Sequence, residues 1–183
     1  MLYIIRHGIT DWNLKHKLQG RTDIPLNSEG KLMCERACKE YADVHFDVCY
    51  CSPLTRARKT AEILLKNRNI PIIADERLVE MCFGIYEGTE NCFSIPDCPL
   101  NTLFHEPRKY TVPPENAESL QQLFERTAEF IRDIIEPELK NNRDVLIVGH
   151  GVLNSAIICQ IKKLPVENMW DFGIENCKLM KLV

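Results

Sequence analysis

Two histidines stand directly after short apolar runs, and each is followed by glycine. The runs at residues 2–5 and 145–148 predict buried strands, so His7 and His150 are expected at strand ends. Imidazole serves as a nucleophile or as an acid–base group near neutral pH. In an open parallel sheet, ligands bind beyond the carboxyl ends of the strands. We therefore expect both rings to face one crevice, although either histidine alone would be better interpreted as an incidental loop residue.

Cations are concentrated at a predicted helix start, in the stretch SPLTRARKTAE. Helix N-termini favour acidic neighbours, yet Arg56, Arg58 and Lys59 occupy the first turns here. A bound phosphate would relieve this arrangement, because guanidinium and free backbone N–H groups bind its oxygens. The alternative is a solvated basic face, or pairing with Glu62 and other carboxylates. Arg6, next to the first histidine, favours the anion pocket, to which we assign Arg56, with the other two cations facing solvent.

The elements that must position these side chains alternate between strand and helix. Strands are predicted at residues 2–5, 46–51, 145–148 and 178–183. Helices are predicted at 31–41, 54–65, 120–135 and 152–161, the first starting at Asn27-Ser28 and the third ending near Pro137. This order predicts an α/β fold with a largely parallel sheet. The length fits one domain over residues 1–183.

One segment breaks this pattern. Residues 88–118 contain prolines that interrupt any regular element, namely Pro96, Pro99, Pro107, Pro113 and Pro114. A long structureless loop inside a compact domain is uncommon. We therefore predict that this segment carries short helices and covers a substrate.

Composition narrows the class of protein. The formal charge of −3 gives no sign of a nucleic-acid or polybasic membrane partner, and no apolar stretch approaches membrane-spanning length. The nine cysteines are an odd number and no secretory signal is present, which favours reduced thiols in the cytoplasm. The cysteines lack zinc-site spacing, so we interpret them mainly as core residues, and no metal or cofactor is expected.

Five ordered segments make the chain similar to a known family. RHGITDWN, LQGRTDIPLNSEG, SPLTRARKTAE, EMCFGIYEG and VGHG resemble the histidine phosphatase superfamily, also called phosphoglycerate mutase-like. The resemblance covers nearly the whole chain. It implies a three-layer α/β/α sandwich with a central, mostly parallel sheet, and a metal-independent reaction through phosphohistidine.

The resemblance also implies roles for individual residues. His7 is the implied nucleophile and Glu80 the implied proton donor, while Arg6, Arg56 and His150 form the phosphate pocket. Thr10, Asn13, Gln19, Gly20 and Gly151 match outer positions that line the substrate site. His16, His45 and His105 match no role. A clamp of arginines and a protonated His150 would neutralise the phosphoryl oxygens where other enzymes use metals.

The proton donor has a rival in the sequence. Glu80 stands just before the Phe83-Gly84 step, where the family pattern has its acid, and Glu87 follows as a second carboxylate. A carboxylic acid can protonate a leaving alkoxide and then accept a proton from water. We prefer Glu80 and interpret Glu87 as a surface carboxylate.

The branch of the family is a further question. The short chain and Gln19 resemble the phosphatases, which predicts a phosphomonoesterase for a small metabolite such as α-ribazole phosphate, a sugar phosphate or a phosphoglycerate. A phosphoglycerate mutase-type transferase and a non-catalytic phosphate-binding or signalling module are the alternatives. Two stretches depart from the pattern, GHGVLNSA and PPENAESL. Because the second stretch lacks the glycines of the family pattern, we assign no role in the site to Glu118. Ser119 either belongs to the site or caps the helix that follows it.

Overall fold

A five-stranded sheet runs through the centre of the computed structural model, which describes residues 1–183. The strands lie in the order β3-β2-β4-β1-β5. β1, β2, β3 and β4 are parallel, and β5 pairs antiparallel with β1. The strand bounds are β1 (Leu2–Arg6), β2 (Val48–Cys51), β3 (Ile72–Ala74), β4 (Val145–Gly149) and β5 (Leu179–Lys181). The prediction of a mostly parallel sheet is confirmed.

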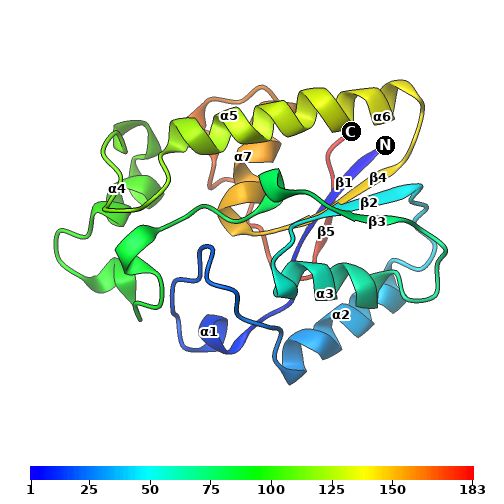
Figure 1. The fold of residues 1–183 in the computed structure, drawn as a ribbon, viewed down its shortest axis with the longest axis horizontal. Coiled ribbons are helices and arrows are strands. Elements are labelled where there is room, and N and C mark those ends of the chain that lie inside the picture. The colour runs from blue at the N-terminus through cyan, green and yellow to red at the C-terminus, as the bar shows by residue number, and fades with distance from the viewer.

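Helices cover both faces of this sheet (Figure 1). α2 (Ser28–Glu40) and α3 (Thr55–Leu64) pack on one face, whereas α5 (Leu120–Phe130), α6 (Glu136–Lys140) and α7 (Gly151–Ile161) pack on the other. Two short helices, α1 (Asp11–Leu14) and α4 (Pro99–His105), lie in the connecting segments. The expected three-layer α/β/α sandwich is therefore present.

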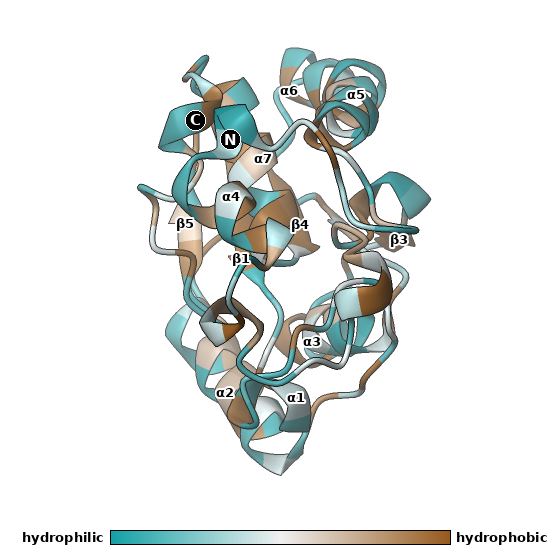
Figure 2. Ribbon diagram, turned by 90° about the vertical axis from the view of Figure 1, so that its left-hand side faces the viewer, coloured by the Kyte–Doolittle hydropathy of each residue, from teal (hydrophilic) through white to brown (hydrophobic).

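The strands supply both halves of the core because their side chains alternate between faces. Leu2 and Ile4 of β1 join the cluster under α5 and α7, and Tyr3 and Ile5 join the cluster under α2 and α3. α7 is buried along most of its length, and hydrophobic residues gather on it and on β4 while α5 and α6 turn polar residues outward (Figure 2). This packing fixes the carboxyl ends of β1 and β4.

The structure corrects two sequence predictions. β3 was not predicted, since it is a three-residue edge strand whose Ile72 and Ile73 are largely exposed. The helix starting at Leu120 does not end near Pro137, because a π-helical turn at Ile131–Ile135 leads directly into α6. Pro137 is the second residue of α6 and follows this π-helical turn, so the change of hydrogen-bond pattern coincides with the residue that has no N–H to donate.

The proline-rich segment at residues 88–118 contains α4 and single 3-10 turns at Cys92–Ser94 and Pro107–Lys109. Leu100 and Leu103 of α4 are fully buried, so the segment is anchored in the core. All nine cysteines of the chain are free thiols. None of the helices combines the length and the apolar character that crossing a membrane would require.

Candidate active site

The two His-Gly pairs meet at one edge of the sheet. β1 and β4 are adjacent and in register, with Arg6 opposite Gly149. The backbone N–H of His7 donates to the Gly149 carbonyl at 3.0 Å, and the His7 and His150 rings lie 5.1 Å apart between centroids. Two residues separated by most of the chain are thereby brought into contact.

The His7 ring is held in one tautomer. Its Nδ1 lies 2.6 Å from the Gly8 carbonyl oxygen, which can only accept, so Nδ1 carries the proton and Nε2 keeps its lone pair. Burial, followed by the nearby charges of Arg56 and Arg6, holds the pKa of His7 well below 6.5. A neutral imidazole with a free Nε2 is a nucleophile at physiological pH.

His150 lies in surroundings that favour the neutral imidazole, whereas the resemblance led us to expect a protonated ring. The side chain is fully buried, and burial followed by the charge of Arg56 holds its pKa well below 6.5. Both of its ring nitrogens are buried without a hydrogen-bond partner. In its neutral form His150 still has one N–H to donate, and it packs behind His7 rather than on the cavity lining.

Two buried guanidinium groups face the same space. Arg56 donates from Nη1 to the Thr22 carbonyl at 2.9 Å and from Nη2 to the Gly20 carbonyl at 2.6 Å. Arg6 donates from Nη1 to the Ile174 carbonyl at 3.1 Å. The Nε atoms of both arginines are buried and unpartnered. Because buried N–H groups are almost always paired, these donors point to an anion as their missing partner.

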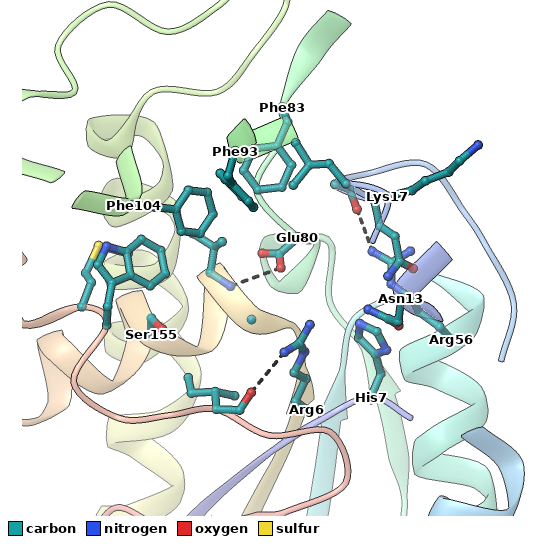
Figure 3. Close-up of a pocket in the computed structure, with 18 of the residues that line it drawn as sticks. Arg6, His7, Asn13, Lys17, Arg56, Glu80, Phe83, Phe93, Phe104 and Ser155 are labelled. Atoms are coloured by element: carbon teal, nitrogen blue, oxygen red, sulfur yellow. Dashed lines mark hydrogen bonds between the residues drawn. The ribbon is translucent and has the colours of Figure 1, made fainter. Parts of the chain in front are cut away.

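Glu80 lies across the cavity from this cationic group and next to the N-terminus of α7 (Figure 3). Its Oε1 accepts from the backbone N–H groups of Met81 and Leu153, both at 2.9 Å, while Oε2 accepts only from Val152, at 3.2 Å. The carboxylate is 7% exposed. These bonds fix its orientation, and Oε2 is the atom that can carry a proton without breaking the two shorter bonds.

Glu87, the rival carboxylate, is not a free surface group. Oε1 accepts from the backbone N–H groups of Arg21 and Phe83, and Oε2 accepts from the N–H and hydroxyl groups of Thr22. The cavity lining includes Glu80 but not Glu87. Glu87 therefore fastens the loop at residues 20–22, whose carbonyls in turn hold Arg56.

The outer predicted positions divide into two groups. Asn13, Gln19, Gly20 and Gly151 line the cavity. Thr10 does not; it is fully buried and caps α1, and its single hydroxyl hydrogen lies within reach of Asn13 Oδ1 at 3.1 Å or Gln19 Oε1 at 3.0 Å. Its place in the structure is therefore behind the lining, where it orients two of the lining residues.

Two residues of the departing stretch PPENAESL have structural contacts. Glu118 is buried and pairs bidentately with Arg126 at 2.7 and 3.0 Å, with Arg21 as a further partner. Ser119 caps α5 in a reciprocal capping box with Gln122, as its alternative interpretation predicted. Neither residue lines the main cavity.

The cavity holds about 320 Å³ and has an apolar side that the sequence analysis did not identify. Its lining there includes Leu18, Phe83, Phe93, Phe104, Val152, Ser155, Met169, Trp170 and Ile174. Two of these, Phe93 and Phe104, come from the 88–118 segment. No group of three or more His, Cys, Asp or Glu side chains is placed to hold a metal ion.

The chain matches known proteins over nearly its full length. A family model described as histidine phosphatase superfamily (branch 1) matches residues 2–183. A 2,3-bisphosphoglycerate-dependent phosphoglycerate mutase from Cytophaga hutchinsonii is 34% identical over 171 residues, which cover 92% of this chain and 80% of the relative.

Solved structures are similar in fold. YhfR of Bacillus stearothermophilus has a TM-score of 0.86 and 30% sequence identity, with 97% of this chain and 88% of that chain covered. Phosphoserine phosphatase from Entamoeba histolytica, in complex with 3-phosphoglyceric acid, has a TM-score of 0.82 and 25% identity, with 97% and 87% covered.

Proposed function

Because the chain belongs to the histidine phosphatase superfamily, branch 1, we propose that it hydrolyses phosphate monoesters of small metabolites through a phosphohistidine formed on His7. The observation that carries this proposal is the convergence of a neutral His7 with unpartnered, buried N–H donors of Arg6 and Arg56. A nucleophile and an anion pocket thus occupy one cavity, with Glu80 on its far side.

In the first step, His7 Nε2 attacks phosphorus and the bond from phosphorus to the leaving oxygen breaks. The guanidinium groups of Arg6 and Arg56 neutralise charge on the phosphoryl oxygens, while the His150 ring packs against His7 from behind the cavity lining. Glu80 Oε2 gives its proton to the departing alkoxide, which leaves as an alcohol. The products of this step are phosphohistidine, a free alcohol and the Glu80 carboxylate.

In the second step, water attacks the phosphohistidine. Glu80 accepts a proton from that water, the bond between phosphorus and Nε2 breaks, and inorganic phosphate is released. His7 returns to its neutral form and Glu80 is protonated again. One carboxylate thus acts first as an acid and then as a base, and the two arginines carry the charge neutralisation.

A mutase is the second candidate, since the relative from Cytophaga hutchinsonii bears that name. A mutase passes the phosphoryl group back to a bound acceptor and must keep water from the intermediate. It would interconvert 2- and 3-phosphoglycerate when primed with 2,3-bisphosphoglycerate, and it would release little phosphate. Phosphate release and mutase turnover, assayed on the same preparation, separate the two candidates.

The proposal is tested by phosphate release from a panel of phosphomonoesters in excess EDTA. Wild type should release phosphate, and His7→Ala should not. His45→Ala is the matched control, because the His45 side chain is 71% exposed and far from the cavity lining. An alkaline quench during turnover should trap phosphate on His7. Full activity of the His7→Ala variant would refute the proposal.

The acid is tested separately through the leaving group. Glu80→Gln should slow hydrolysis of alkyl phosphates by about 10²- to 10⁴-fold, the usual contribution of a general acid. In kcat/KM, which reports only the step that forms phosphohistidine, it should affect p-nitrophenyl phosphate far less, because that leaving group needs no proton. An equal loss on both substrates would assign Glu80 to positioning instead.

A further inference from the structure

The apolar side of the cavity is built around three aromatic rings in contact with one another. Phe93 and Phe104 meet edge to face with 4.6 Å between ring centroids, and Phe104 stacks on Trp170 at 4.7 Å. Phe83, buried just beyond Glu80, adds a fourth ring to the lining. Figure 3 places Phe83, Phe93 and Phe104 on the same side of the cavity as Glu80, away from His7. The alcohol part of a bound ester therefore meets this wall.

These rings are held in place by the surrounding fold. The Trp170 indole N–H donates to the Leu103 carbonyl at 3.1 Å, and Leu103 is fully buried in α4. The turn that carries Phe93 is anchored by two buried thiols, Cys92 and Cys98, whose sulfur atoms are 3.3 Å apart. The wall is therefore formed before a ligand arrives, and binding does not have to order it.

Phe93 nevertheless remains 47% exposed at the cavity mouth. An exposed aromatic side chain that borders a preformed cavity gains apolar burial only when a ligand covers it. An aromatic ring on the ligand would continue the existing stack, an arrangement in which ring pairs are favourable beyond their buried area.

The positions of the charged lining residues also favour an uncharged ligand group against the aromatic wall. The cationic lining residues are Arg6, Arg56 and Lys17, and the first two belong to the phosphate pocket. Lys17 lies at the opposite rim from Ser155 in Figure 3. Ser155, 3% exposed, supplies the lining's one hydroxyl group. A carboxylate placed against the aromatic wall would lose its hydration without gaining a cation.

We infer that the enzyme selects phosphate monoesters of uncharged aromatic alcohols, with Phe93, Phe104 and Trp170 as the specificity-determining wall and Ser155 as the hydrogen-bond partner of one polar atom on the leaving group. This inference rests on the proposed phosphatase function. It predicts that phosphoserine and 3-phosphoglycerate, which bear a carboxylate next to the ester, are poor substrates.

The test compares two esters of primary alcohols, benzyl phosphate and ethyl phosphate, whose breaking bonds are chemically alike. Burial of the phenyl ring should raise kcat/KM for benzyl phosphate about 10- to 100-fold over ethyl phosphate. Phe93→Ala should reduce that ratio about threefold or more, because the variant loses more on the benzyl ester than on the ethyl ester. Val112→Ala is the matched control, since Val112 is 77% exposed in the same segment and lies off the cavity lining.

Equal kcat/KM values for the two esters, or a preference for phosphoserine or 3-phosphoglycerate over benzyl phosphate, would overturn the inference and leave the phosphatase function intact. Absence of turnover on every ester would instead overturn the proposed function. In that case, calorimetry measures the binding affinities of benzylphosphonate and ethylphosphonate, which test the aromatic wall without turnover. Tighter binding of the benzyl compound, weakened by Phe93→Ala, supports the wall, and equal affinities overturn it.

Discussion

Replacing Glu87 with glutamine should loosen the loop that holds Arg56 without removing the catalytic acid. The four hydrogen bonds to the Glu87 carboxylate are made by Arg21, Phe83 and Thr22, at distances between 2.5 and 3.1 Å. In glutamine one oxygen becomes an NH₂ donor. If the remaining amide oxygen still accepts from Arg21 and Phe83, the new NH₂ group faces the backbone N–H of Thr22, and that hydrogen bond is lost. The Thr22 hydroxyl can rotate and accept a hydrogen bond from the NH₂ group instead.

Hydrogen bonds to charged groups contribute about 1.5–3 kcal/mol each. Loss of one backbone bond and weakening of the others should lower the free energy of unfolding by about 2–4 kcal/mol. Urea denaturation of wild type and Glu87→Gln measures this difference. Glu90→Gln is the control, because Glu90 is exposed and three residues further along the chain.

Kinetics complete the test of Glu87. Its glutamine variant should lose activity by the same factor on alkyl and p-nitrophenyl phosphates, since it acts on the position of Arg56 and not on the leaving group. A change in unfolding free energy below about 0.5 kcal/mol, typical of ordinary surface substitutions, would refute the anchoring role. A loss confined to alkyl phosphates would make Glu87, and not Glu80, the general acid.

Further predictions concern pH, a buried ion pair and a glycine. The unfolding free energy should fall as pH drops below about 6.5, because burial and Arg56 hold the pKa of His7 and His150 well below 6.5 in the folded state whereas the unfolded chain takes up protons there. The limiting slope is about 1.4 kcal/mol per pH unit for each ring, and equal urea midpoints at pH 6.5 and 5.5 would contradict it. Arg126→Met should cost about 3 kcal/mol by leaving the buried carboxylate of Glu118 without its bidentate partner, and adding Glu118→Leu should recover part of that loss in the same denaturation assay. Gly20→Ala should lower the melting temperature and raise KM, because the residue has a φ of +54° and its new methyl group would collide with the Glu87 carboxylate; an unchanged KM would show that the loop does not position the phosphate pocket.

The sequence predicted those parts of the fold that depend on continuous local patterns. Residues 2–5 of β1 and 145–148 of β4 are uncharged apolar runs buried on both faces, so their composition and the His-Gly pairs that follow located them. β3 escaped prediction because Ile72–Ala74 is short, has exposed side chains and forms backbone hydrogen bonds with β2 alone among the strands. Its conformation depends on a neighbour that is distant in the sequence.

In the candidate site too, residues in local sequence motifs were predicted and residues brought together by tertiary packing were not. His7, Arg56 and Glu80 sit in recognisable motifs, and the structure brings them to one cavity. The aromatic wall could not be predicted, because Phe93 and Trp170 come from segments whose contact is set by tertiary packing and leaves no periodic signal in either. The burial that lowers the pKa of His150 was not predictable either, because it depends on how the layers pack and leaves no local signal in the sequence.

The central place of β1 in the sheet also has a consequence for synthesis on the ribosome. β1 emerges first, yet its partners are β4 and β5, and Leu2 pairs with Val145. At 5–20 residues per second, Val145 is made roughly 7 to 30 s after Leu2. During that interval β1 has no partner for its backbone N–H and C=O groups, and its apolar side chains remain uncovered. The nascent chain should therefore be a client of ribosome-associated chaperones, and His7 meets His150 only after residue 150 has been translated.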